Sequence, residues 1–107
     1  MSFDFYGRRP NGTVIMLRDN HPRSLNMANT NCIALLKLLA LPVQDQYGEA
    51  DIHTVRRAII KAKALLGSRD PEEYAPLSEA YVQDRLTKLS VCVETLGGMG
   101  ASIIYWA

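Results

Sequence analysis

The sequence has little of what usually reveals a function. It holds only two cysteines, Cys32 and Cys92, and both fall inside apolar helical patterns, which excludes a disulfide scaffold. The formal net charge is +1, so no overall field favours nucleic acid or a membrane surface. The longest apolar run, 32–43, contains Lys37 and Pro42 and is shorter than the ~20 residues of a membrane span. With no secretory signal pattern either, we expect a cytoplasmic protein.

A glycine-rich phosphate loop is also lacking. The segment Gly97-Gly98-Met99-Gly100 follows a predicted helix and precedes a predicted strand. Phosphate cradles need the opposite order, because the anion lies against the free amides at a helix N-terminus. These glycines are therefore predicted to end a helix and form a tight connection, and we expect no cofactor.

What remains is the pattern of a single domain, 1–107, of the α+β class. Asn11-Gly12 between two apolar runs predicts an N-terminal hairpin, and alternation over 23–28 predicts a further strand. We expect an antiparallel or mixed four-stranded sheet with helices mainly on one face, the last strand being 102–106. That apolar terminal strand is expected to be inserted in the sheet, since an exposed one would promote aggregation.

Three helices are predicted between these strands. The first ends near Ala40 and is capped by Asn29 or Thr30, and its leucines occupy nearly the whole circumference. A polar loop, 44–50, leads to Asp51, which caps the second helix, and the third runs over 77–96. The expected buried faces of the second and third helices are Ile52, Val55, Ile59, Ala62 and Leu66, and Val82, Leu86, Leu89, Val93 and Leu96.

Two Asp-x-His pairs are the candidates for chemistry. Asp19/His21 and Asp51/His53 together offer two carboxylates and two imidazoles, a set that suits a divalent transition metal and would support a small metal- or ligand-binding enzyme. The favoured interpretation is local: the first pair belongs to a turn, and the second begins a helix. Apolar surroundings that raise a thiol pKa likewise argue against a nucleophilic cysteine. We therefore expect neither metal nor catalysis.

The second helix is the most basic element, which leaves a nucleic-acid-binding module as another alternative. Arg57 and Lys61 lie about 40° apart on its outer face at 100° per residue, and Arg8 and Arg9 add positive charge elsewhere. Since Arg56 and Lys63 flank the apolar face instead, no single basic stripe forms. A solvated helix face is the favoured interpretation.

Tyrosines offer another candidate, because one ring buries much area while keeping a polar group. Aromatic residues make up 7% of the chain, and we expect most of them in the core. Tyr47 and Tyr74 lie in polar surroundings, so we expect both to be exposed. The predicted partner-binding residues are Tyr47, Tyr74, Arg57, Lys61, Arg8 and Arg9.

The order of segments also carries a resemblance. A strand, Asn-Met-Ala-Asn-Thr-Asn, a leucine-rich helix, Tyr-Gly-Glu, a basic helix, a long helix and a strand ending in Trp106 resemble the pattern of small bacterial and phage α+β proteins. The resemblance spans most of the chain and implies no activity for any residue. It suggests an accessory factor of a phage or mobile element.

The function expected from these observations is a small non-catalytic interaction protein that occludes the surface of a protein partner. A homodimer is also expected, because 14–17 and 103–106 are apolar throughout, which suggests a sheet whose second face is covered as well.

Overall fold

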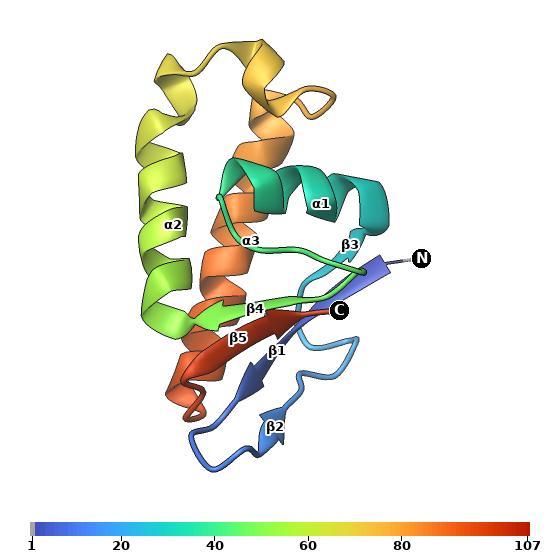
Figure 1. Ribbon diagram of the computed structural model, residues 1–107, viewed down its shortest axis with the longest axis vertical. Coiled ribbons are helices and arrows are strands. Elements are labelled where there is room, and N and C mark those ends of the chain that lie inside the picture. Colours follow the sequence, from blue (N-terminus) through green and yellow to red (C-terminus); the bar gives the residue numbers. More distant parts are fainter. Residues whose placement is uncertain (1) are drawn as a thin grey trace.

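An antiparallel sheet and three helices make up the fold (Figure 1). The computed structural model describes residues 2–107, without the side chain of Pro71. The α+β class predicted from the sequence is confirmed, and over these residues the sheet has five strands rather than four. The strands are β1 Ser2–Arg8, β2 Val14–Ile15, β3 Asn26–Ala28, β4 Gly48–Asp51 and β5 Ile103–Trp106. The helices are α1 Asn29–Leu38, α2 Ile52–Leu65 and α3 Glu79–Gly98, with two short 3₁₀ turns, Leu66–Ser68 and Pro71–Tyr74.

The predicted terminal strand β5 lies inside the sheet. The strand order is β2-β1-β5-β4, and β3 pairs with the start of β1. Phe5 of β1 faces Trp106, and Ala50 of β4 faces Ile104, so both edges of β5 are paired. The predicted hairpin is also present, since β1 pairs antiparallel with β2. Segments from the two ends and the middle of the chain thus share one sheet (Figure 1).

Strand β4 is not predicted by the local sequence, which has the pattern of a polar loop over 44–50. Its residues, Gly-Glu-Ala-Asp, have low intrinsic strand preference. Gly48 is nevertheless required here, because a Cβ at this position would collide with the Pro42 carbonyl and the Trp106 ring. Close approach of the Pro42 segment to β5 therefore decides the residue, whereas local propensity does not.

The helix ends agree only partly with prediction. The side chain of Asp51 accepts a 2.8 Å hydrogen bond from the His53 amide, as predicted for the start of α2. The predicted cap of α1 is wrong: the N-cap position is Ala28, which has no side-chain cap, and Asn29 already lies in the helix. Helix α3 continues past the predicted stop at Leu96 and ends at Gly98, and Gly100 supplies the left-handed turn, with φ +98°.

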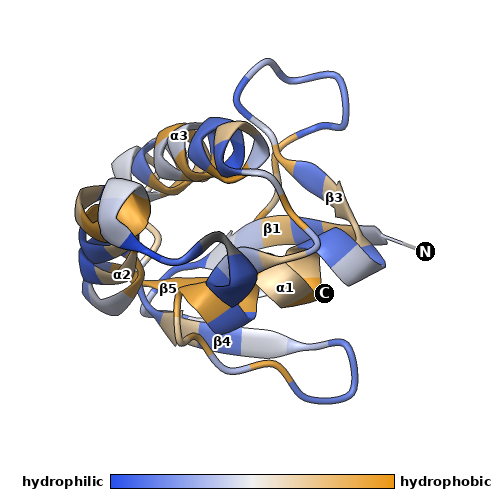
Figure 2. Cartoon of the chain, turned by 90° about the horizontal axis from the view of Figure 1, so that it is seen from above, coloured by the Kyte–Doolittle hydropathy of each residue, from blue (hydrophilic) through white to orange (hydrophobic). Residues whose placement is uncertain are grey.

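The helices cover one face of the sheet and leave the other open. Helices α2 and α3 lie side by side, and Figure 2 shows hydrophobic segments where strands and helices meet and hydrophilic connections outside them. The predicted faces of α2 and α3 are buried, together with alternate strand residues such as Phe3, Phe5 and Trp106. Within residues 2–107, no helix combines the length and the apolar character that a membrane crossing demands.

Candidate functional site

The open face of the sheet gathers the side chains best suited to recognition. In β1 the residues that point to the helices are buried, and the alternate ones, including Tyr6 and Arg8, are only half-buried. In β5 the same alternation leaves Ile103 and Tyr105 half-buried while Ile104 and Trp106 are fully buried. Burial therefore alternates along both strands, and 103–106 gives no support for a covered second face. We call Tyr6, Arg8, Tyr47, Glu49 and Tyr105 the tyrosine cluster.

The rings of this cluster are held against each other by the strand register. Tyr6 is the direct partner of Tyr105, which is in turn the partner of Glu49. The Tyr6 and Tyr105 rings stack with centroids 4.9 Å apart, and the Tyr47 ring lies 5.9 Å from Tyr105 at a tilt of 34°. Such contacts between adjacent strands favour fixed ring positions before any partner arrives.

One ion pair completes the cluster. An Arg8 Nη donates a 2.7 Å hydrogen bond to Glu49, and the Tyr47 hydroxyl donates a 2.6 Å bond to the other Glu49 oxygen. These bonds stabilise the carboxylate, so the Tyr47 hydroxyl first, and then Arg8, lower the pKa of Glu49. The same hydrogen bond raises the pKa of Tyr47. Arg8 also lies over the Tyr105 ring, with its guanidinium carbon 5.9 Å from the ring centroid. The charges of Arg8 and Glu49 cancel, and contacts join every member of the cluster to another member.

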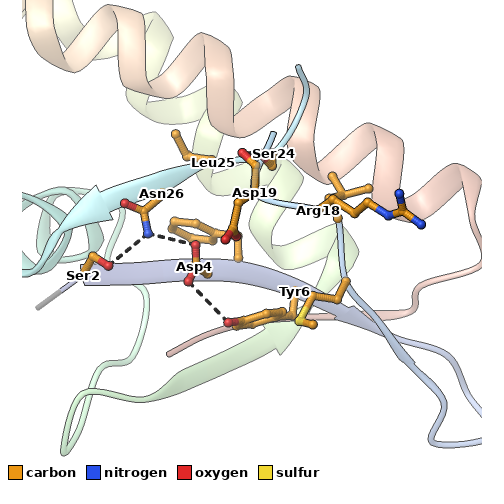
Figure 3. A pocket seen from close by; sticks show the side chains of 11 residues that line it. Ser2, Asp4, Tyr6, Arg18, Asp19, Ser24, Leu25 and Asn26 are labelled. Atoms are coloured by element: carbon orange, nitrogen blue, oxygen red, sulfur yellow. Dashed lines mark hydrogen bonds between the residues drawn. The ribbon is translucent and has the colours of Figure 1, made fainter. Parts of the chain in front are cut away.

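A pocket adjoins the cluster at Tyr6, where β2 and β3 separate along the edge of β1 (Figure 3). Its volume is about 690 Å³, within the range of small-ligand sites. In Figure 3 the Asp19 side chain points toward Asp4 and Tyr6, and the Arg18 guanidinium points away from them. Tyr6 donates a 3.4 Å bond to one Asp4 oxygen, and Asn26 donates a 2.9 Å bond to the other. The pocket thus has an acidic, hydrogen-bonded wall.

Two of the six predicted partner-binding residues come together in the cluster, namely Arg8 and Tyr47. Tyr47 is 40% exposed, as predicted. Arg9 lies at the end of the hairpin, where its Nε donates to the Met99 carbonyl. Arg57 and Lys61 are exposed on α2, away from the open face, and Arg56 beside them is paired with Glu94 at 2.7 Å.

The prediction of an exposed Tyr74 is wrong. Tyr74 ends the second 3₁₀ turn and is only 5% exposed. The surrounding sequence is polar, but the turn packs against α1, and this contact brings the ring into the core. Burial here is set by tertiary packing, which the local sequence does not report.

The two Asp-x-His pairs are not combined into one metal site. Asp51 accepts the His53 amide as a helix cap, and His21 Nδ1 accepts a 3.0 Å bond from the Arg23 amide. In the part of the chain that the structure describes, no three His, Cys, Asp or Glu side chains are grouped closely enough to hold an ion. Each pair makes local contacts, in agreement with the favoured interpretation.

The cysteines are buried free thiols. Burial raises the pKa of Cys32 to about 12 and that of Cys92 to about 11. A nucleophilic cysteine needs a stabilised thiolate, and both environments disfavour it.

Sequence reasoning missed Tyr6, Tyr105 and Glu49 as site residues. The alternation of Phe3, Phe5 and Gly7 with Asp4, Tyr6 and Arg8 was the available signal, because every second residue of β1 is polar or amphipathic.

Comparisons with protein-family models, with curated proteins and with solved structures find no match to this chain.

Proposed function

We propose that the protein is a non-catalytic interaction module that binds a protein partner on the open face of its sheet. The observation that carries this proposal is the tyrosine cluster, in which three rings and an Arg8/Glu49 pair are fixed on a face that the helices leave uncovered. Tyrosine and arginine are enriched at binding hot spots, and a ring fixed in advance loses little conformational entropy on binding.

The charge of the cluster favours a protein over nucleic acid. Single-stranded nucleic acids bind where aromatic rings lie in a positively charged groove. Here Glu49 neutralises Arg8, and Asp4 of β1 and Asp51 of β4 add negative charge to the same face of the sheet. A surface of mixed polar and aromatic groups without excess positive charge suits a protein interface better than a nucleic-acid site.

Self-association through this face is the second candidate. Val14 is 52% exposed and Met16 66% exposed beside the cluster, which leaves apolar area for an interface. Arg8 and Glu49 carry opposite charges, so a two-fold contact of the face with itself is electrostatically complementary. We also propose a cytoplasmic location, where the two buried thiols of Cys32 and Cys92 stay reduced.

Affinity capture from the native host, followed by reconstitution, tests the proposal. The purified protein is compared with a double variant, Tyr47→Ala with Tyr105→Ala, and with Ile60→Ser, which changes a 68% exposed apolar residue on α2. We expect a protein that is captured by the parent and by Ile60→Ser, and that binds the double variant at least tenfold more weakly after purification.

Three results would contradict this expectation. Binding that survives in the double variant, or that is lost in Ile60→Ser alone, would move the interface off the sheet. Capture that nuclease treatment abolishes would favour the nucleic-acid alternative. Light scattering at micromolar and higher concentration separates the two protein candidates, because a dimer that the double variant dissociates assigns the face to a second copy.

A further inference from the structure

Strand β1 has a break in pairing along one edge, and this break opens into the pocket. Gly7 is paired with Ile15 of β2, and Phe3 is paired with Met27 of β3. Phe5 lies between them, and its only registered partner is in β5. Asp4 is also registered with Asn26, and this pair directs the Phe5 N–H toward Leu25. Among the described residues, the Phe5 C=O has no strand partner on this edge of β1.

The backbone of Phe5 faces this break. Asp4 exchanges two hydrogen bonds with Ala107 beyond β5, at 2.9 and 3.2 Å, so the polar backbone groups of Asp4 point toward β5. In a strand, successive residues direct these groups to opposite edges. The N–H and C=O of Phe5 consequently point to the edge shared by β2 and β3. The N–H is directed at Leu25, and the C=O points into the gap, where Phe5 lines the pocket. A buried backbone acceptor without a strand partner favours a ligand that supplies a hydrogen-bond donor.

The side chains around the gap add a preference for positive charge. Both Asp4 oxygens are held by donors, from Asn26 and Tyr6, which fixes this carboxylate at the pocket wall. Asp19 lines the same pocket, and no residue that the structure describes donates a hydrogen bond to its carboxylate. Asp4 accepts the hydrogen bond of the Tyr6 hydroxyl, and in Figure 3 Asp19 points toward both residues. Burial and then Asp4, with a smaller effect of Asp19, raise the pKa of Tyr6. The exposed thioether of Met16 provides an apolar wall for the stem of a long side chain.

We propose that this pocket binds an extended segment of a protein partner, whose main chain donates a hydrogen bond to the Phe5 C=O and whose basic side chain places its cation between Asp4 and Asp19. The proposal rests on the proposed function, since the pocket adjoins the tyrosine cluster at Tyr6. The main-chain hydrogen bond at the strand edge contributes affinity, and the carboxylates supply the selectivity for a basic residue.

Small probes test the pocket without knowledge of the partner. N-acetyl-lysine N-methylamide carries both amides and the ammonium group, its norleucine analogue lacks the charge, and n-butylamine lacks the amides. Titration of the ¹⁵N-labelled protein with each probe is followed by amide chemical shifts. We expect the lysine probe to bind with a millimolar Kd, to perturb Phe5 and Tyr6 most strongly, and to bind about tenfold more tightly than either partial probe.

Matched variants assign the charge. Asp19→Asn is expected to weaken binding of the lysine probe by about three- to tenfold. Asp45→Asn removes an exposed carboxylate in the turn before β4 and is expected to leave the Kd of the lysine probe unchanged. If the norleucine probe binds as tightly as the lysine probe, or if Asp19→Asn leaves the Kd unchanged, the proposed preference for a basic side chain is wrong. If n-butylamine binds as tightly as the lysine probe, the pocket does not recognise a main chain, and it is a site for a free amine instead.

These results separate the pocket from the docking surface. If the probes fail and capture still depends on Tyr47 and Tyr105, the pocket proposal is wrong and the interaction module stands. If the probes bind as expected and capture does not depend on these tyrosines, the tyrosine cluster is not the surface that binds the partner.

Discussion

The two faces of the sheet are built from the same strands and differ in what they contribute. Toward the helices, β5 places Ile104 and Trp106, both fully buried, and the Trp106 indole donates a 3.0 Å bond to the Pro42 carbonyl. Toward the open side it places Tyr105, whose ring contacts Tyr6 and Tyr47. Adjacent residues of one strand thus belong to the core and to the candidate site.

This difference predicts that stability and binding can be changed separately. Burial of apolar side chains on the helix side removes large areas from water, whereas the open side retains polar contacts that solvent weakens. Substitutions on the covered face should therefore reduce the free energy of unfolding, and substitutions on the open face should reduce partner binding with smaller effects on folding.

The largest effect is expected from truncation after Gly100, which removes β5 and splits the sheet between β1 and β4. Several buried side chains at ~1.5–3 kcal/mol each approach the whole ~5–15 kcal/mol stability of a domain. Far-UV circular dichroism during heating should show no cooperative transition. Removal of Ala107 alone is the control and should retain the transition, and a truncated chain that melts near the parent would contradict the role of β5.

Neighbouring substitutions in β5 compare the faces directly. Trp106→Ala should lower the free energy of unfolding by about 3–5 kcal/mol, because it leaves a cavity and an unpaired Pro42 carbonyl. Tyr105→Ala should cost about 1–2 kcal/mol, since this ring is only half-buried. Urea denaturation of both variants gives the two values. Equal losses would mean that the open face is as important for folding as the core.

The long periodic elements of this fold are predictable because their signals are local. Val55 and Ile59 mark one face of α2 by spacing alone, and Asp51 marks its start through a bond to a residue two positions away. Strand β4 carries no such signal, since Gly48 and Glu49 become part of a strand only through pairing with β5, more than 50 residues later. Long-range pairing decides this element.

The candidate site shows the same limit. Residue type alone points to Arg8 and Tyr47, but only the order β1-β5-β4 brings them to one carboxylate, Glu49. Tyr105 stands in an apolar run that predicts a core position. A tyrosine is compatible with either the buried or the exposed face of a sheet, because it has an apolar ring and a polar hydroxyl. Tyr74 shows the converse, a ring in a polar segment that tertiary packing buries.

Gly48→Ala tests the contact that joins the edge strand to the core. The new Cβ would overlap the Pro42 carbonyl and the Trp106 ring, so backbone must move, and we expect a loss of about 1–3 kcal/mol. Gly67→Ala is the matched control, because a Cβ at Gly67 would meet no other part of the described chain within 4 Å. Thermal melting of both variants is the measurement, and an unchanged melting temperature for Gly48→Ala would show that this edge adapts without loss.

The smallest expected effect concerns Glu49 on the open face, and it appears as a dependence of stability on pH. The hydrogen bond from Tyr47, and then Arg8, lower the pKa of Glu49 in the folded protein below its unfolded value. The stabilisation is therefore present above the unfolded pKa and is lost as pH falls through the folded pKa. Glu49→Gln should be slightly less stable than the parent at pH 7, and urea denaturation from pH 7 to pH 3 should show the two curves converge. Parallel curves would mean that the Arg8/Glu49 pair orders the tyrosine cluster without contributing to folding, which would sharpen the division between the two faces.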